Sequence, residues 1–161
     1  MPEQDTLRTG SEPLLKNRRA IAGLSVFSGT VLGGIALFQM GVFKKLPDPP
    51  LAFFDSERVN GSKEAYSIAE TPDALLGMIS YAATGCLAGM GGTDRWTTQR
   101  WIPIALAVKT AADAALAGKL SIEQWTKFRK FSFWSMLVAG ATFAACPLAI
   151  PEAKQAWKQR P

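Results

Sequence analysis

Two serines, Ser132 and Ser135, stand three positions apart where a cationic stretch gives way to an uncharged, apolar segment. Cysteines at this spacing would form the CxxC motif of a thiol redox site, because a thiolate attacks disulfides and the pair can itself become one. A serine hydroxyl has no disulfide state. The pair is therefore either the outline of a former redox centre or two small polar residues of a helix.

Few other residues could do chemistry. The chain has no histidine, which excludes histidine ligation of zinc or haem and histidine acid–base catalysis. Its two cysteines, Cys86 and Cys146, lie singly inside apolar stretches, with neither CxxC spacing nor a metal-binding cluster around them. We expect them to be packing residues, and no metal site is predicted.

One pair of charges interrupts an alanine-rich segment. Lys109 and Asp113 are four residues apart, which places them on one face of a helix. Charges inside a membrane are costly and pair with each other or face the protein interior, so an intramembrane charge pair is predicted. Three interpretations stay open: a pair that locks helix packing, a proton- or quinone-related role, or a helix that does not fully span the membrane.

The elements that position these residues are predicted to be membrane helices. The composition is 48% hydrophobic and 19% charged, and residues 20–43, 74–93 and 131–151 contain no charge. About 20 mainly apolar residues are enough for a helix to cross a bilayer. We therefore expect an all-α integral membrane four-helix bundle over residues 20–155. Its helices are predicted at about 20–43, 72–92, 101–119 and 131–150.

The polar segments complete this organisation. Residues 1–19 are predicted to be an N-terminal tail and residues 156–161 a C-terminal tail. Residues 44–70 form a long loop between the first two helices, with a stiff "LPDPP" stretch, and we expect this loop to cover one end of the bundle.

The net charge of +5 comes from Lys and Arg grouped beside the apolar segments, as at membrane helix ends, so nucleic acid is not expected as a partner. The basic group Lys16, Arg18 and Arg19 favours a cytoplasmic N-terminus. The predicted location is a membrane.

Several segments together resemble a known family. The "LPDPP…FDSERVNGS" loop, "TPDALLG" at 71–77 and "SFWS" at 132–135 are similar to bacterial members of the vitamin K epoxide reductase family, over roughly residues 20–155. The resemblance implies a four-helix, multi-pass enzyme of the bacterial inner membrane that couples disulfide formation to quinone reduction. In that family a CxxC lies beside the quinone at the outer end of the last core helix, and a second cysteine pair usually lies in the first loop.

This sequence departs from the family pattern at the reacting atoms. The resemblance maps the CxxC onto Ser132 and Ser135, and residues 44–70 contain no cysteine. The family's reaction is therefore expected to be absent. Three explanations stay open: natural decay of a redox centre, an engineered Cys-to-Ser exchange, or ordinary helix serines in a chain outside the family.

These observations lead to three functional hypotheses. The first is a non-catalytic accessory or scaffolding subunit of a larger membrane complex, of electron-transfer or photosynthetic type, with other membrane subunits and the bilayer as partners. The alternative is a quinone-linked thiol–disulfide oxidoreductase of the vitamin K epoxide reductase type. The third is a pocket formed by Phe131, Phe133, Trp134 and Ser135 that binds a quinone or lipid, and no other cofactor is assigned.

Overall fold

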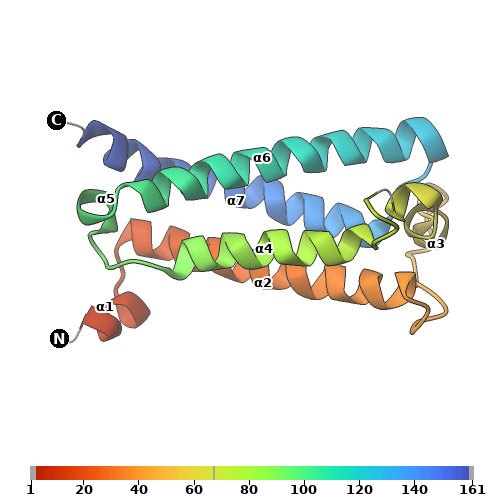
Figure 1. The fold of residues 1–161 in the computed structure, drawn as a ribbon, viewed down its shortest axis with the longest axis horizontal. Helices are drawn as coiled ribbons and strands as arrows, with labels where there is room; N and C mark the ends of the chain where they lie inside the picture. Colours follow the sequence, from red (N-terminus) through yellow and green to blue (C-terminus); the bar gives the residue numbers. More distant parts are fainter. Residues whose placement is uncertain (1–2, 67, 160–161) are drawn as a thin grey trace.

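Four long helices run side by side in alternating directions in the computed structural model, which describes residues 3–66 and 68–159 (Figure 1). No strand occurs among these residues, and the all-α prediction is confirmed for them. The long helices are α2 (Pro13–Gln39), α4 (Asp73–Gly89), α6 (Trp101–Glu123) and α7 (Phe133–Lys158). The short ones are α1 (Glu3–Thr9), α3 (Ser56–Asn60), η1 (Lys63–Tyr66), α5 (Arg95–Thr98) and the π-helical turn η2 (Gln124–Phe128).

Three helices are long and apolar enough to cross a membrane: α2, α7, and α6 continued through η2 as Trp101–Phe128. The fourth long helix, α4, has 17 residues, or about 25 Å at the helical rise of 1.5 Å per residue. The prediction of membrane helices is thus supported for three of the four long helices. Whether the protein has three or four membrane-spanning helices depends on whether α4 crosses the membrane.

Alanine and other small side chains make up much of the helix contacts. Helix α2 packs closely against both α4 and α7, and α6 packs against α7, whereas the contact between α4 and α6 is slighter. Small residues let helix backbones approach closely where no hydrophobic effect drives helices together. The buried clusters are Ile21, Ala88, Leu106, Ala145 and Ala149 in one half of the bundle, and Ile35, Ala36 and Ala74 in the other.

The N-terminal segment, predicted to be a polar tail, is largely helical among its described residues. Helix α1 forms over Glu3–Thr9, and α2 begins at Pro13, well before the apolar stretch starts. Proline is tolerated in a first helical turn because its missing N–H has no intrahelical partner there. The Arg19 guanidinium donates to the carbonyls of Leu7 and Gly10, each at 2.7 Å. These hydrogen bonds connect α1 and the turn after it to α2.

Other helix ends also differ from the predicted bounds. Helix α2 stops at Gln39 rather than residue 43, because Gly41 adopts a left-handed conformation (φ 78°) that closes the helix. Helix α6 continues past residue 119 to Glu123. At the C-terminus α7 runs through Pro151 to Lys158, so the predicted tail is partly helical; residues 160 and 161 lie outside the described residues.

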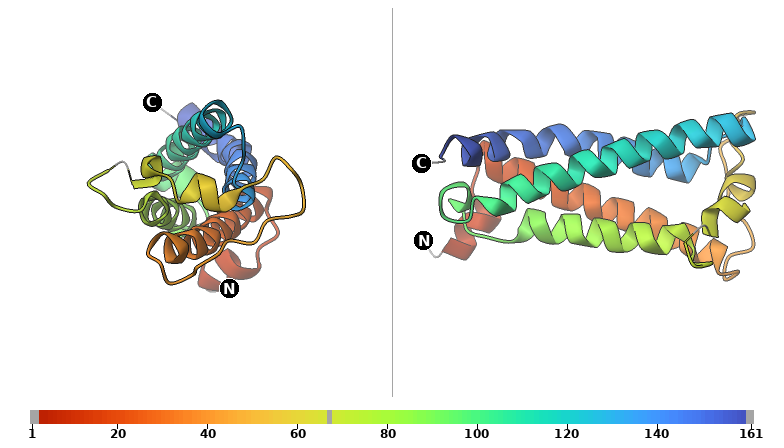
Figure 2. Two further views of the ribbon diagram at one scale, coloured as in Figure 1. Left: turned by 90° about the vertical axis from the view of Figure 1, so that its right-hand side faces the viewer. Right: turned by 45° about the horizontal axis from the view of Figure 1, so that its top comes forward.

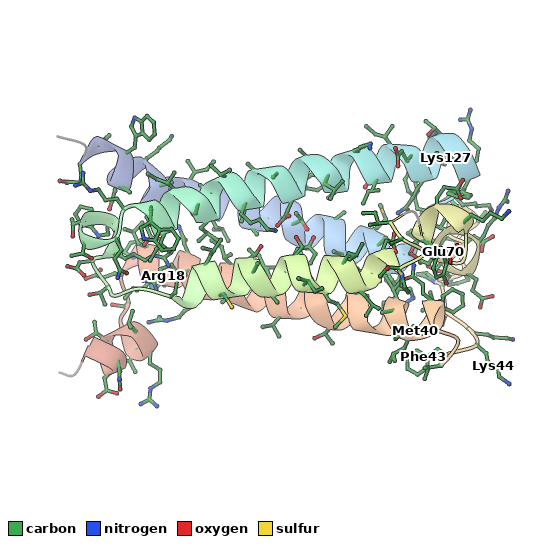
Figure 3. All side chains as sticks on the ribbon, viewed as in Figure 1. Arg18, Met40, Phe43, Lys44, Glu70 and Lys127 are labelled. Carbon is green, nitrogen blue, oxygen red and sulfur yellow. The ribbon has the colours of Figure 1, made fainter. Side chains whose placement is uncertain are left out.

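The two ends of the bundle are built differently. At one end α3 lies across the helix ends, as the end-on view shows (Figure 2), and we call residues 44–66 the cap. Lys44, Glu70 and Lys127 lie at this end, and Arg18 lies at the opposite end with α1, α5 and both termini (Figure 3). The segment predicted to cover one end of the bundle therefore does so.

Candidate functional site

Ser132 sets the start of α7. Its hydroxyl accepts a hydrogen bond from the Ser135 amide at 3.2 Å, as an N-cap does, and its side chain is fully buried. Its own amide donates to Gln124 Oε1 at 3.0 Å. The helix predicted from residue 131 therefore begins at Phe133. Ser132 caps that helix instead of bonding back to a preceding turn.

Asn60, the last residue of α3, joins both serines. Its amide nitrogen donates to Ser132 Oγ at 2.7 Å and to the Ser56 carbonyl at 3.0 Å, and its Oδ1 accepts from Ser135 Oγ at 3.3 Å. The Asn60 carbonyl accepts from Gln39 Nε2 of α2 at 3.2 Å. One amide side chain thus holds the cap against the start of α7.

A third serine lies beside this pair. Ser56 is fully buried at the start of α3, and its hydroxyl accepts from the Phe133 amide at 3.0 Å. The Ser56 amide and hydroxyl donate to the two carboxylate oxygens of Asp48 at 2.6 and 2.5 Å. Sequence reasoning did not identify Ser56, Asp48 or Asn60. Asp55 is the N-cap of α3, because its carboxylate accepts from the Arg58 amide at 3.0 Å, and this capping signal could have drawn attention to the neighbouring Ser56. No local pattern points to Asp48 or Asn60.

The aromatic residues of the predicted pocket are largely engaged with the protein itself. Phe131 stacks on Trp125 with ring centroids 5.4 Å apart, and Phe133 meets Trp134 edge-on at 5.5 Å. The Trp134 indole donates to the Pro47 carbonyl of the cap at 2.9 Å. These contacts do not test the quinone or lipid pocket, which stays a prediction.

A quinone would need hydrogen-bond donors for its carbonyl oxygens. The amides of Asn60 and Gln39 and the hydroxyl of Tyr66, at this end, already donate to protein oxygens. Among the described residues, the one buried side-chain oxygen or nitrogen without a hydrogen-bond partner is Ser28 Oγ, in the middle of the bundle. The amide and hydroxyl donors at the cap end are therefore already used within the protein, and no reaction step is assigned through a quinone.

The two cysteines lie away from the serines. Cys86 is exposed on α4 and Cys146 is partly buried on α7; neither forms a disulfide. Cys146 follows Ser132 by about four helical turns, roughly 21 Å. Neither thiol can replace the serines at the start of α7. No group of histidine, cysteine or acidic side chains among the described residues could hold a metal ion.

The charge pair is formed and lies between two helices. Lys109 Nζ of α6 is 2.5 Å from Asp113 Oδ2 and donates to Ser80 Oγ of α4 at 2.7 Å, while Thr84 Oγ1 of α4 donates to Asp113 Oδ2 at 3.2 Å. These bonds join α6 to α4, whose contact is slighter than the contacts of α7 with α2 and α6. Of the three interpretations of the pair, this geometry favours a pair that locks helix packing.

The opposite end contains a buried ion pair that sequence reasoning missed. Arg95 of α5 is fully buried and donates through Nε and Nη2 to the two Glu152 carboxylate oxygens of α7, at 2.7 and 2.6 Å. Arg95 and Arg18 also donate to carbonyl oxygens of residues 87–92. Cations suit a helix C-terminus, where carbonyls lack partners. In the sequence, a basic residue shortly after the helix-ending "GMGG" stretch could have suggested that Arg95 binds the last carbonyls of α4.

These features define a helical protein with membrane-type helices, in which a loop cap is hydrogen-bonded to a Ser-x-x-Ser pair at the start of the last long helix. The model of the vitamin K epoxide reductase family matches residues 20–150, most of the chain, and the chain belongs to that family. Comparison with curated proteins and with solved structures finds no match.

Proposed function

We propose that this member of the vitamin K epoxide reductase family is a non-catalytic membrane protein, an accessory or scaffolding subunit. One observation carries the proposal: the hydroxyls of Ser132 and Ser135 both hydrogen-bond the side chain of Asn60, at the place where the family's redox pair is expected. A redox pair must form and break a disulfide, which hydroxyls cannot do. In this protein the same positions fasten the cap to α7.

The distribution of tryptophan supports a bundle anchored at both membrane surfaces. Trp125 and Trp134 lie at the cap end, and Trp101 and Trp157 lie at the opposite end; Trp101 and Trp157 are more than half exposed. Tryptophan concentrates at membrane–water interfaces. We propose that all four long helices cross the bacterial inner membrane with the N-terminus in the cytoplasm, and that other membrane subunits pack against the bundle.

The competing function is a quinone-linked thiol–disulfide oxidoreductase that works through Cys86 and Cys146. It is tested by reconstituting the protein in vesicles with a quinone and following oxidation of a dithiol. We expect no oxidation above that of empty vesicles. Oxidation that disappears in Cys86→Ala or Cys146→Ala would establish the enzyme and overturn the proposal.

A variant with the family's thiols tests whether the chemistry is missing only at these two positions. In a Cys86→Ala/Cys146→Ala background, Ser132→Cys/Ser135→Cys is expected to form an internal disulfide, because the two positions flank the first turn of α7 and already share one partner. Thiol labelling before and after reduction measures it. The matched control is Ser132→Cys alone, which should keep its thiol.

Gentle solubilisation tests the role as a subunit. The protein is expected to migrate as part of a larger assembly with other membrane proteins, and a small monomer without partners would contradict this role. Solvent extraction of the same sample identifies any bound ligand. We expect lipid rather than quinone, because the amide and hydroxyl donors near the serines already have protein acceptors.

A further inference from the structure

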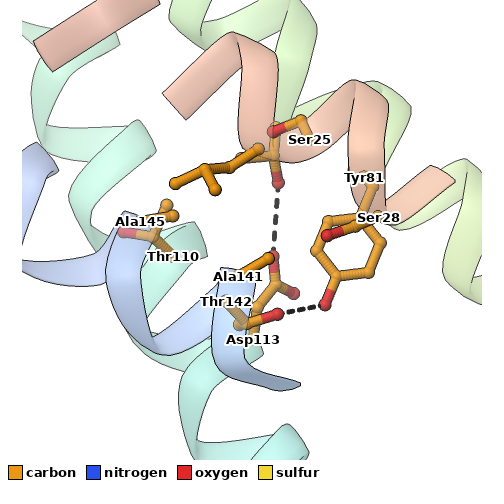
Figure 4. Close-up of a pocket in the computed structure, with 10 residues that line it drawn as sticks. Ser25, Ser28, Tyr81, Thr110, Asp113, Ala141, Thr142 and Ala145 are labelled. Carbon is orange, nitrogen blue, oxygen red and sulfur yellow. Dashed lines mark hydrogen bonds between the residues drawn. The ribbon is translucent and has the colours of Figure 1, made fainter. Parts of the chain in front are cut away.

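All four long helices contribute a hydroxyl to one cavity in the middle of the bundle (Figure 4). The cavity has a volume of about 10 Å³, enough for about one water molecule. It is separate from the serines at the cap and from the arginines at the opposite end. The polar residues that line it are Ser25 and Ser28 of α2, Tyr81 and Thr84 of α4, Thr110 and Asp113 of α6, and Thr142 of α7.

Most hydroxyl protons around the cavity are already committed to other acceptors. Ser25, Thr110 and Thr142 donate to carbonyls of their own helices, at 2.8, 3.1 and 2.7 Å. Since the single proton of Thr142 is used in this way, Tyr81 must be the donor in the hydrogen bond that joins the two hydroxyls (Figure 4). Thr84 donates to Asp113.

Ser28 is the exception. Its side chain is 1% exposed, it lines the cavity, and its hydroxyl has no partner. A buried hydroxyl without a hydrogen bond is costly, and such groups in native proteins are usually satisfied by ordered water. The cavity thus presents one unused donor, on Ser28, together with the Tyr81 oxygen and the Asp113 carboxylate, which already accepts from Lys109, Ser80 and Thr84.

One donor and two acceptors match the hydrogen bonds of a water molecule, which can accept a hydrogen bond from one group and donate to two others. We propose that the cavity is a built water site, in which a single water accepts from Ser28 and donates toward the Tyr81 oxygen and the Asp113 carboxylate. The water also links α2 to the other helices at this level. The hydrogen bond of the neighbouring Ser25 hydroxyl stays within α2.

The direction in which Ser28→Ala shifts the melting temperature tests the proposal. If water is bound, Ser28→Ala removes its donor, and the melting temperature in detergent should fall by about 3 °C, the shift typical of one lost hydrogen bond in a chain of this size. If the cavity is dry, the same change removes an unsatisfied hydroxyl, and the melting temperature should stay level or rise. The second result would overturn the proposal.

Ser25→Ala is the matched control, because Ser25 lies on the same helix and lines the same cavity but donates to the Ile21 carbonyl. It should lower the melting temperature by less than half as much as Ser28→Ala; an equal loss would contradict a special role for Ser28. An experimental structure of the unaltered protein, at a resolution that shows ordered water, gives an independent test. Density within hydrogen-bonding distance of Ser28 Oγ supports the site, and an empty cavity refutes it.

Discussion

At the scale of single residues, Asn60 holds the cap to the bundle. Its side chain makes hydrogen bonds to Ser132, Ser135 and the Ser56 carbonyl, and its carbonyl binds Gln39. It is 6% exposed, so water does not readily replace these bonds. The loss of the Asn60 side chain would leave polar groups on two segments without partners.

We therefore expect Asn60→Ala to lower the free energy of unfolding by about 2 kcal/mol, within the range for leaving buried polar groups unsatisfied. Ser62→Ala is the control, because the Ser62 hydroxyl donates only to the Val59 carbonyl within the cap. Its effect should be below about 1 kcal/mol. Chemical unfolding in detergent micelles measures both, and equal losses would show that Asn60 has no special role.

The sequence predicts contacts between residues that are close along the chain. Lys109 and Asp113 are four positions apart, and helical geometry alone places them on one face. Asn60 and Ser132 are 72 positions apart, and no local pattern relates them. Asn60 stands before a glycine in what reads as a turn, so its role as the partner of two serines could be seen only in the folded chain.

At the scale of elements, the end of α4 is held by Arg95 and Arg18, whose guanidinium groups bind its terminal carbonyls. Glu152 of α7 pairs with Arg95, and both side chains are at least 95% buried. Five guanidinium donors suit this arrangement, because a lysine offers fewer donors and no fork for the carboxylate. The pair connects the loop after α4 to the last helix.

Arg95→Ala is predicted to lower the free energy of unfolding by about 3 to 5 kcal/mol, because it leaves Glu152 as an unpaired buried charge. The control is Lys119→Ala, which breaks the exposed pair with Glu123 and should cost less than about 1 kcal/mol. Thermal and chemical unfolding of the detergent-solubilised variants compare the two. A loss for Arg95→Ala no larger than that for Lys119→Ala would contradict this account.

The hydropathy pattern predicted the positions of the long helices more accurately than it predicted their ends. An apolar stretch identifies the part of a helix that lipid or core can surround, but a helix continues as long as its backbone and side chains find partners. Helix α7 continues beyond Pro151 because Glu152 and Ala156 are buried against neighbouring elements. The end of α7 therefore depends on contacts that a hydropathy pattern does not contain, whereas α2 ends at a glycine signal that hydropathy does not weigh.

At the scale of the whole molecule, the topology depends on α4, the shortest of the four long helices. If α4 crosses the membrane, Lys44 before it and Thr98 after it lie on opposite sides. If it does not, both lie on the same side. Both residues are exposed, so each position can report its compartment.

We predict that Lys44→Cys and Thr98→Cys, each made in a chain with Cys86→Ala and Cys146→Ala, react with a membrane-impermeant maleimide from opposite sides. With the N-terminus in the cytoplasm, Lys44→Cys is labelled in intact spheroplasts and Thr98→Cys only after permeabilisation. The reverse pattern would invert the proposed orientation. Labelling of both variants from one side would exclude α4 as a membrane span.

An even number of antiparallel long helices returns the chain to the end where it started, so both termini lie at the end of the bundle opposite the cap (Figure 1). If α4 also crosses the bilayer, a reporter or affinity tag fused at either terminus would sit in the same compartment and leave the cap uncovered. With all four helices crossing the bilayer, a tether at the termini and a contact at the cap would act on opposite faces of the membrane. The cap surface is then open to a partner that the termini never meet.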